Sequence, residues 1–170
     1  EIQANAFLNC TALSYVYFGY RVPEIIHADA FKNTALVNNH KDGVVYIDEV
    51  ALCYKAPKKA ATTIKIKEGV EHIADGCLYN IDGVKQIYIP SSVEVIGYDN
   101  IQECKDLKRV YIAGKYTTKM PIMQGGKEFK TKYYVKSNAY YTLAALKEDA
   151  VYFREDSNYY DISTNWNPDK

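Results

Sequence analysis

The sequence predicts an α/β protein, rich in strands, that is built as a solenoid of stacked repeats. The first observation is that apolar residues recur with a fixed period of roughly 23 residues, which is typical of supersecondary units that are each too small to bury their own apolar face. The second is that each repeat closes with a short run of alternating apolar and polar residues, which is a strand pattern. The third is the length of 170 residues, enough for one domain with a continuous core.

The repeat is clearest between Ser92 and Ile112. Its apolar or small template positions are Ile96, Asn100, Ile101, Cys104, Leu107, Val110 and Ile112. One period earlier lie Ile73, Cys77, Leu78, Ile81, Val84, Ile87 and Ile89, and the N-terminal copy has Ile2, Ala6, Phe7, Cys10, Leu13, Val16 and Phe18. We expect these positions to form the core.

The N-terminal half contains one repeat that ends in a strand and one that is interrupted. In the first repeat, alternation predicts a strand with Leu13, Val16 and Phe18 inward and Tyr15 and Tyr17 outward. The second repeat begins at Ile25 and contains an insertion of about 25 residues by template counting. The insertion is predicted to be a β-hairpin over about 44–54, and the pattern leaves open whether its first strand joins the main sheet.

The C-terminal half contains two regular repeats and an irregular end. Template strands are expected at Ile64–Ile66, Ile87–Ile89 and Val110–Ile112, and the period is lost after Gly114. Residues 115–132 are expected to be a connector. A strand at 132–135, a helix at 139–149 after an N-cap at Ser137, and a strand at 151–153 then predict a strand-helix-strand cap. Residues 163–170 are expected to fray. We expect residues 1–114 to form the repeats and 115–170 the connector and cap, packed as one domain.

These positions resemble a known signature. Ile96-Gly97, Ala6-Phe7, Cys10, Leu13 and Ile87-Tyr88-Ile89-Pro90 are similar to the pattern Ile-Gly-x-x-Ala-Phe-x-x-Cys-x-x-Leu-x-x-Ile-x-Ile-Pro of bacterial BspA-type leucine-rich repeats. The resemblance covers Ile2 to Gly114. It implies a right-handed solenoid, secretion or exposure at the cell surface, and adhesion or host-protein binding without catalysis. Departures are Asn100-Ile101 and Cys77-Leu78 in place of Ala-Phe, and Thr34 and Ile81 in place of the cysteine.

Charge and hydropathy exclude several functions. The chain has 21 basic and 21 acidic residues, so no net field attracts nucleic acid. No apolar run approaches the roughly 20 residues of a membrane span, so we expect no insertion into a membrane. The chain shows no leader, and because Glu1-Ile2 lies within a repeat, we expect further sequence upstream.

Cysteine and histidine spacing predicts neither an enzyme nor a metal or cofactor site. Cys10, Cys53, Cys77 and Cys104 are expected to be reduced, and the three that fit the template are expected to point inward from different layers. His27, His40 and His72 lack any paired ligand spacing. We expect His27 and His72 to lie in turns near the surface.

The outward strand positions are the candidate ligand-binding residues. Tyr17, Tyr88 and Tyr111 share one template site, which Lys65 occupies in the intervening strand, and Tyr15, Gln86 and Arg109 share the site two residues earlier. Stacked layers would align them as a ladder. Tyrosine combines a large contact area with few rotatable bonds, which suits recognition of a host or bacterial surface protein or glycan. The alternative is that these tyrosines only satisfy strand propensity and packing in a structural spacer.

A second candidate surface is the basic stretch between Lys105 and Lys136. It contains nine basic and two acidic residues, a net charge of +7. Such a stretch suits an anionic glycan, an acidic protein or a lipid surface. The alternative is a solvated connector that nearby carboxylates balance.

Overall fold

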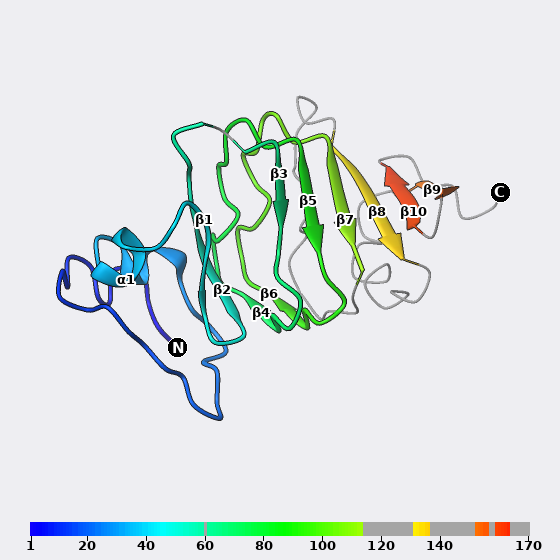
Figure 1. Ribbon diagram of the computed structural model, residues 1–170. Coiled ribbons are helices and arrows are strands. Elements are labelled where there is room, and N and C mark those ends of the chain that lie inside the picture. The colour runs from blue at the N-terminus through cyan, green and yellow to red at the C-terminus, as the bar shows by residue number, and fades with distance from the viewer. Residues whose placement is uncertain (60, 114–130, 137–151, 157–158, 164–170) are drawn as a thin grey trace.

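The computed structural model describes residues 1–59, 61–113, 131–136, 152–156 and 159–163, and its strands form two sheets (Figure 1). The helical elements are the 3-10 helix η1 (Ala28–Phe31) and α1 (Ala35–Asn38). The strands are β1 (Gly43–Ile47), β2 (Val50–Lys55), β3 (Thr63–Lys65), β4 (His72–Ile73), β5 (Gln86–Ile89), β6 (Val95–Ile96), β7 (Arg109–Ile112), β8 (Lys132–Lys136), β9 (Tyr152–Asp156) and β10 (Tyr159–Ser163). A strand-rich fold with little helix is therefore confirmed.

The larger sheet has the strand order β3-β5-β7-β8-β10-β9. Its first four strands are parallel, and each neighbour is displaced by one full repeat, so that Lys65 is aligned with Tyr88, Tyr88 with Tyr111, and Tyr111 with Tyr134. The predicted strand at 132–135 is present as β8. It continues the register of the repeats, which the sequence pattern indicated was lost after Gly114. β10 and β9 are antiparallel additions.

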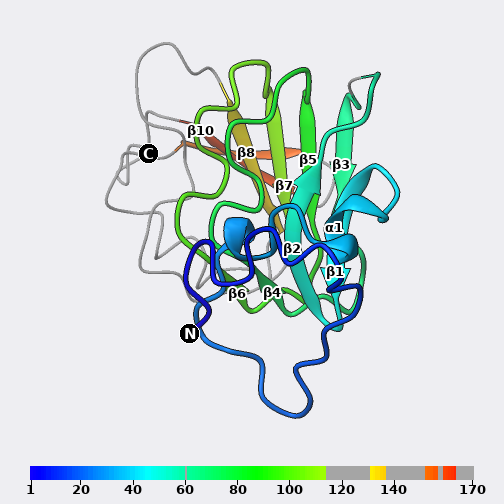
Figure 2. The same ribbon diagram turned by 90° about the vertical axis from the view of Figure 1, so that its left-hand side faces the viewer.

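The smaller sheet has the order β1-β2-β4-β6 and lies along a different side of the stack (Figure 2). The predicted hairpin is confirmed as the antiparallel pair β1 and β2, with a β-bulge between Val45 and Tyr46. β2 pairs in parallel with β4, which pairs in parallel with β6. The hairpin therefore joins the smaller sheet, and β3 is left as the first strand of the larger one.

The template positions of the two regular repeats are all buried, as predicted. They include the side chains of Ile73, Leu78, Ile101 and Val110, whose exposure is 0%. In the first repeat, by contrast, Ala6, Phe7 and Cys10 are exposed. That repeat has a described neighbour on one side only, where the ring of Phe7 stacks on Phe31 with centroids 5.0 Å apart.

The strand predicted from Leu13 to Phe18 is wrong, because these residues form no strand. A parallel strand needs a partner, and the corresponding part of the second repeat is the helix α1, whose N-terminus is capped by the Thr34 hydroxyl. The backbone amide of Phe18 instead donates to the carboxylate of Asp48 in the hairpin turn. Tyr15 and Tyr17 are thus left outside both sheets.

The end of the chain was predicted in part. β9 overlaps the strand expected at 151–153, whereas the helix expected at 139–149 falls outside the residues that the structure describes. β10 was not predicted, and Ser163 belongs to it although the polar end of the chain was expected to fray from this residue. The remainder of that polar end also falls outside the described ranges.

Close contacts between layers depend on a glycine and a buried amide. A β-carbon at Gly97 would lie 2.6 Å from the backbone nitrogen of Asp75 in the preceding layer, so only glycine fits. The amide of Asn100 is also buried. It accepts a hydrogen bond from the Leu78 amide and donates to the carbonyls of Ala74 and Gly97. The bonds to Leu78 and Ala74 link adjacent layers, and the bond to Gly97 lies within the layer of Asn100 itself.

Candidate functional site

Lys65, Tyr88 and Tyr111 form a continuous stack on the outward side of β3, β5 and β7. The rings of Tyr88 and Tyr111 are nearly parallel, with an interplanar angle of 5° and centroids 4.4 Å apart. The Lys65 ammonium lies 5.5 Å from the Tyr88 centroid, within the range of a cation–π interaction. The parallel register produces this stack, because it places equivalent side chains at the same height in successive layers.

A second row runs beside the stack at the start of the same strands. Thr63, Gln86 and Arg109 are aligned in register, and Arg109 is exposed. The Tyr88 hydroxyl donates to the Gln86 side-chain carbonyl at 3.2 Å, which fixes the tilt of the phenol. We call Lys65, Gln86, Tyr88, Arg109 and Tyr111 the tyrosine face.

A hollow of about 290 Å³ adjoins the tyrosine face at the carboxyl ends of the strands. It is lined by Lys65, Ile66, Glu68, Tyr88, Ile89, Pro90, Ser91, Tyr111 and Ala113. Both flat sides of the Tyr88 ring are occupied, one by Tyr111 and the other by Lys65. A ligand would therefore meet the edge and hydroxyl of this ring and the neighbouring cations.

Tyr15 and Tyr17 do not belong to this face. Their side chains are 73% and 63% exposed in the irregular segment before the hairpin. The predicted ladder is therefore present for Lys65, Tyr88 and Tyr111 and for the flanking Gln86 and Arg109, and it does not extend to the first repeat.

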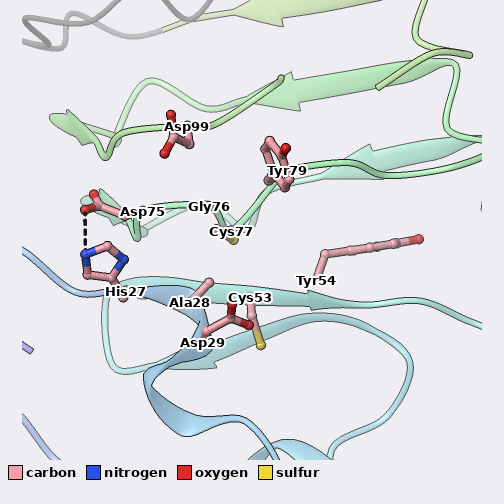
Figure 3. Close-up of a pocket in the computed structure, with 10 residues that line it drawn as sticks. All are labelled: His27, Ala28, Asp29, Cys53, Tyr54, Asp75, Gly76, Cys77, Tyr79 and Asp99. Atoms are coloured by element: carbon pink, nitrogen blue, oxygen red, sulfur yellow. Dashed lines mark ion pairs between the residues drawn. The ribbon is translucent and has the colours of Figure 1, made fainter. Parts of the chain in front are cut away.

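A separate pocket of about 490 Å³ lies between η1, the end of β2 and the layer that follows β4 (Figure 3). Its ionisable lining includes His27, Asp29, Cys53, Asp75, Cys77 and Asp99. The His27 Nε2 lies 3.7 Å from the Asp75 Oδ2, while the other carboxylate oxygen of Asp75 accepts the Tyr98 amide at 2.9 Å. No group of His, Cys, Asp and Glu in the described part of the chain is arranged to hold a metal ion.

The thiols of this pocket are poorly suited to nucleophilic chemistry. Burial, with a smaller contribution from Asp29, raises the pKa of Cys53 to about 11. Burial also raises the pKa of Cys77 well above its ordinary value. Both groups are therefore protonated near neutral pH, whereas the thiolate is the reactive form. Sequence reasoning missed this pocket because its residues lie in distant segments without a shared motif.

His72 is buried in β4, so its predicted position in a surface turn is wrong. Val50 and Val95 flank it in register on either side, which explains its burial. Its Nε2 atom has no hydrogen-bond partner among the described residues, and burial lowers the pKa of its imidazole despite the opposing charge of Asp75. His27 is not in a turn either: it forms an isolated bridge with Asp75 and is partly exposed.

All four cysteines are free, as predicted. Cys77 and Cys104 point inward and are buried, but Cys10 is exposed, because its layer has a described neighbour on one side only. In the basic stretch, Lys105, Lys108 and Arg109 are exposed, whereas residues 114–130 are not among those described.

The geometry defines a repeat protein in which the short parallel strands β3, β5, β7 and β8 stack in register, each displaced from its neighbour by one repeat. The family model described as "BspA type Leucine rich repeat region", in 6 copies, matches residues 1–120. The chain belongs to this family. No curated protein and no solved structure matches it. Among the residues described, no helix is long and apolar enough to cross a membrane.

Proposed function

We propose that this chain is a non-catalytic binding module, secreted or exposed at a bacterial surface, that recognises a protein or glycan through the tyrosine face. Membership of a repeat family typical of bacterial surface proteins supports the location and the lack of catalysis. The proposal includes a right-handed solenoid whose C-terminal unit caps the stack. The repeat register that persists into β8 supports this architecture.

The observation that carries the proposal is the stack of Lys65 on Tyr88 on Tyr111. Because the flat sides of the Tyr88 ring are occupied, the surface offers ring edges, hydroxyls and cations in a fixed array. The Lys65 ammonium and the Arg109 guanidinium suit ligands that carry hydrogen-bond acceptors or negative charge. The Tyr88 hydroxyl donates its proton to Gln86, so its oxygen can accept a hydrogen bond from a ligand. Carboxylates of a protein, or acidic and hydroxyl groups of a glycan, have this chemistry.

The rigidity of the face favours affinity. Tyr88 is held by its neighbours on both sides and by Gln86, so little side-chain freedom remains to be lost when a ligand binds. Ordering a flexible side chain at an interface costs roughly 0.5–1.5 kcal/mol. A preorganised aromatic row avoids part of that cost, and the adjoining hollow of about 290 Å³ offers space for a protruding ligand group.

An array of glycans and extracellular matrix proteins tests the proposal. Any ligand found should bind Arg109→Ala and Tyr88→Phe more weakly than wild type, because these changes remove a cation and a hydroxyl while the strands are retained. Lys105→Ala, an exposed cation outside the face, is the matched control and should bind normally. Loss of binding only in parallel with loss of thermal stability would contradict the proposal.

The alternative is a structural spacer that holds another domain away from the cell. The regular layer spacing favours this reading, because stacked repeats extend a chain by a constant amount per repeat. A spacer would bind nothing on the array. Its function would also survive replacement by unrelated repeats of similar length.

A further inference from the structure

In the described part of the chain, the first strand of the larger sheet has one edge without a partner strand. β3 pairs with β5 and with no other strand in the described sheet. The Thr62 carbonyl accepts the Gln86 amide, and the Ile66 amide donates to the Tyr88 carbonyl. Since backbone groups alternate in direction along a strand, those of Thr63 and Lys65 point away from β5. Among the described residues, none forms a backbone hydrogen bond with these two on that side.

A groove of about 400 Å³ runs along this edge. One wall is β3 with Thr63, Ile64 and Lys65, and the other is formed by the hairpin, which lies next to β3 in Figure 1. The remaining lining residues are Asp42, Gly43, Val44, Tyr46, Tyr54, Pro57, Lys59 and Ala61. The Tyr46 hydroxyl accepts the Lys67 amide at 3.2 Å and links the two walls. The groove thus brings polar and apolar side chains together with strand backbone groups that no described residue pairs.

The chain around the groove is strongly basic. From Lys55 to Lys67 it carries five lysines and no Asp or Glu. The Lys55 ammonium donates to the carbonyls of Asn38 and His40, whereas the other four lysines are exposed. Asp42 is the one carboxylate among the lining residues. Negatively charged ligands are therefore favoured at this edge.

We propose that the open edge of β3 binds an extended, acidic peptide segment of a partner protein as an added strand. The outward backbone groups of Thr63 and Lys65 would form the ladder, and the groove would take alternate side chains. The lysines also argue against a second copy of this chain, because symmetric pairing of two such edges would oppose like charges. This site shares Lys65 with the tyrosine face, but it uses the strand backbone and the hairpin groove in place of the tyrosine rings.

The probe is a short fluorescent peptide that alternates valine and glutamate, with a valine–lysine peptide as its control. Anisotropy should show binding of the acidic peptide only, and the affinity should fall as salt is raised. Lys65→Ala removes the cation but keeps the backbone amide, and Lys65→Pro removes both. We expect Lys65→Pro to bind about fivefold more weakly than Lys65→Ala, the effect of one net hydrogen bond. Lys105→Ala should bind as wild type does.

A second measurement does not depend on the fold of any variant. Two forms of the acidic peptide are compared, one N-methylated at the valine amides and the other at the glutamate amides, because these two sets lie on opposite edges of a strand. One form should lose binding and the other should keep it. Equal effects of the two patterns, absence of acidic-peptide binding, or self-association of the wild-type chain through this edge in sedimentation would overturn the proposal.

Discussion

The rings of Tyr88 and Tyr111 stack almost in parallel, with centroids 4.4 Å apart, although the two residues are separated by a complete repeat. Their strands pair with both residues in register, so this contact reports directly on how the layers are stacked. Each ring is only partly buried. The pair therefore both stabilises the fold and forms part of the exposed tyrosine face. A variant that truncates either ring changes the stability and the surface at once.

The aromatic pair should show measurable coupling. In a double-mutant cycle with Tyr88→Ala and Tyr111→Ala, we expect a coupling free energy of about 0.5–1.5 kcal/mol, the range for stacked aromatic pairs. Urea unfolding of the four proteins measures it. Both single Tyr→Phe variants keep the ring and should lose much less stability. Additive losses in the alanine cycle would show that the rings do not support each other in solution.

Gly97→Ala should destabilise the stack. The new methyl group would meet the backbone and carboxylate of Asp75, which cannot move without separating two layers. Overpacking of this kind costs roughly 1–3 kcal/mol. Chemical denaturation provides the measurement. An alanine variant as stable as wild type would show that the layers are less tightly joined at this point than the structure indicates.

Replacing Asn100 should be costly, although its position corresponds to an alanine in the family signature. Asn100→Ala leaves the buried Leu78 amide without its acceptor, a loss of about 1–3 kcal/mol. Asn100→Asp keeps that acceptor but turns a carboxylate oxygen toward the carbonyls of Ala74 and Gly97. We expect the aspartate variant to recover stability relative to wild type as acid protonates the carboxylate. Equal stability deficits at neutral and acidic pH would contradict this account.

His72 should make the protein less stable in mild acid. Burial lowers the pKa of its imidazole below the ordinary value of 6.5, so the unfolded chain binds a proton more readily than the folded one. The free energy of unfolding should therefore decrease as pH falls below about 6.5, by at most about 1.4 kcal/mol per pH unit, until the folded pKa is reached. Unfolding curves across this window for wild type and His72→Phe test the assignment. An unchanged slope in the variant would assign the effect to another group.

The cysteines should differ sharply in reactivity. Cys10 is exposed and should be alkylated first by iodoacetamide, whereas Cys77 and Cys104 are buried and should react only after unfolding. The raised pKa of Cys53, about 11, reduces its thiolate fraction near neutral pH by about a hundredfold relative to an ordinary thiol. Mass spectrometry of peptides after timed alkylation gives the order. Early labelling of Cys77 in the native protein would contradict the described packing.

The predictions from sequence were accurate in the two regular repeats. β5 and β7 each show the alternation of a strand at equivalent template positions, and their core residues were identified correctly. Tyr17 has the same local pattern in the first repeat, but no described strand lies beside it. β10 was missed because its antiparallel pairing with β8 lies outside the repeat template. Alternation shows that a segment can form a strand, whereas pairing depends on a distant partner.

The candidate sites, too, could be predicted from the sequence only in part. The alignment of Tyr88 with Tyr111 could be predicted by counting one repeat along the chain. The sequence did not predict that both faces of the Tyr88 ring are occupied, because this depends on side-chain rotamers and on the position of the Lys65 ammonium. Nor did it predict the groove beside β3, because its walls come from two sheets that approach only in three dimensions.

The sequence by itself determined which residues of the regular repeats are buried and the interval at which their strands align. Burial and strand propensity are encoded in short windows, and repetition of the window imposes a common register. Only the tertiary structure decided where the stack of the larger sheet begins, which sheet receives the hairpin, and that no described segment pairs with the outer edge of β3. Those outcomes depend on which segment supplies the neighbouring strand. In the second repeat, the helical turn at Ala35–Asn38 stands where the repeat period would place a strand of the larger sheet, and the inserted hairpin pairs with β4 of the smaller sheet.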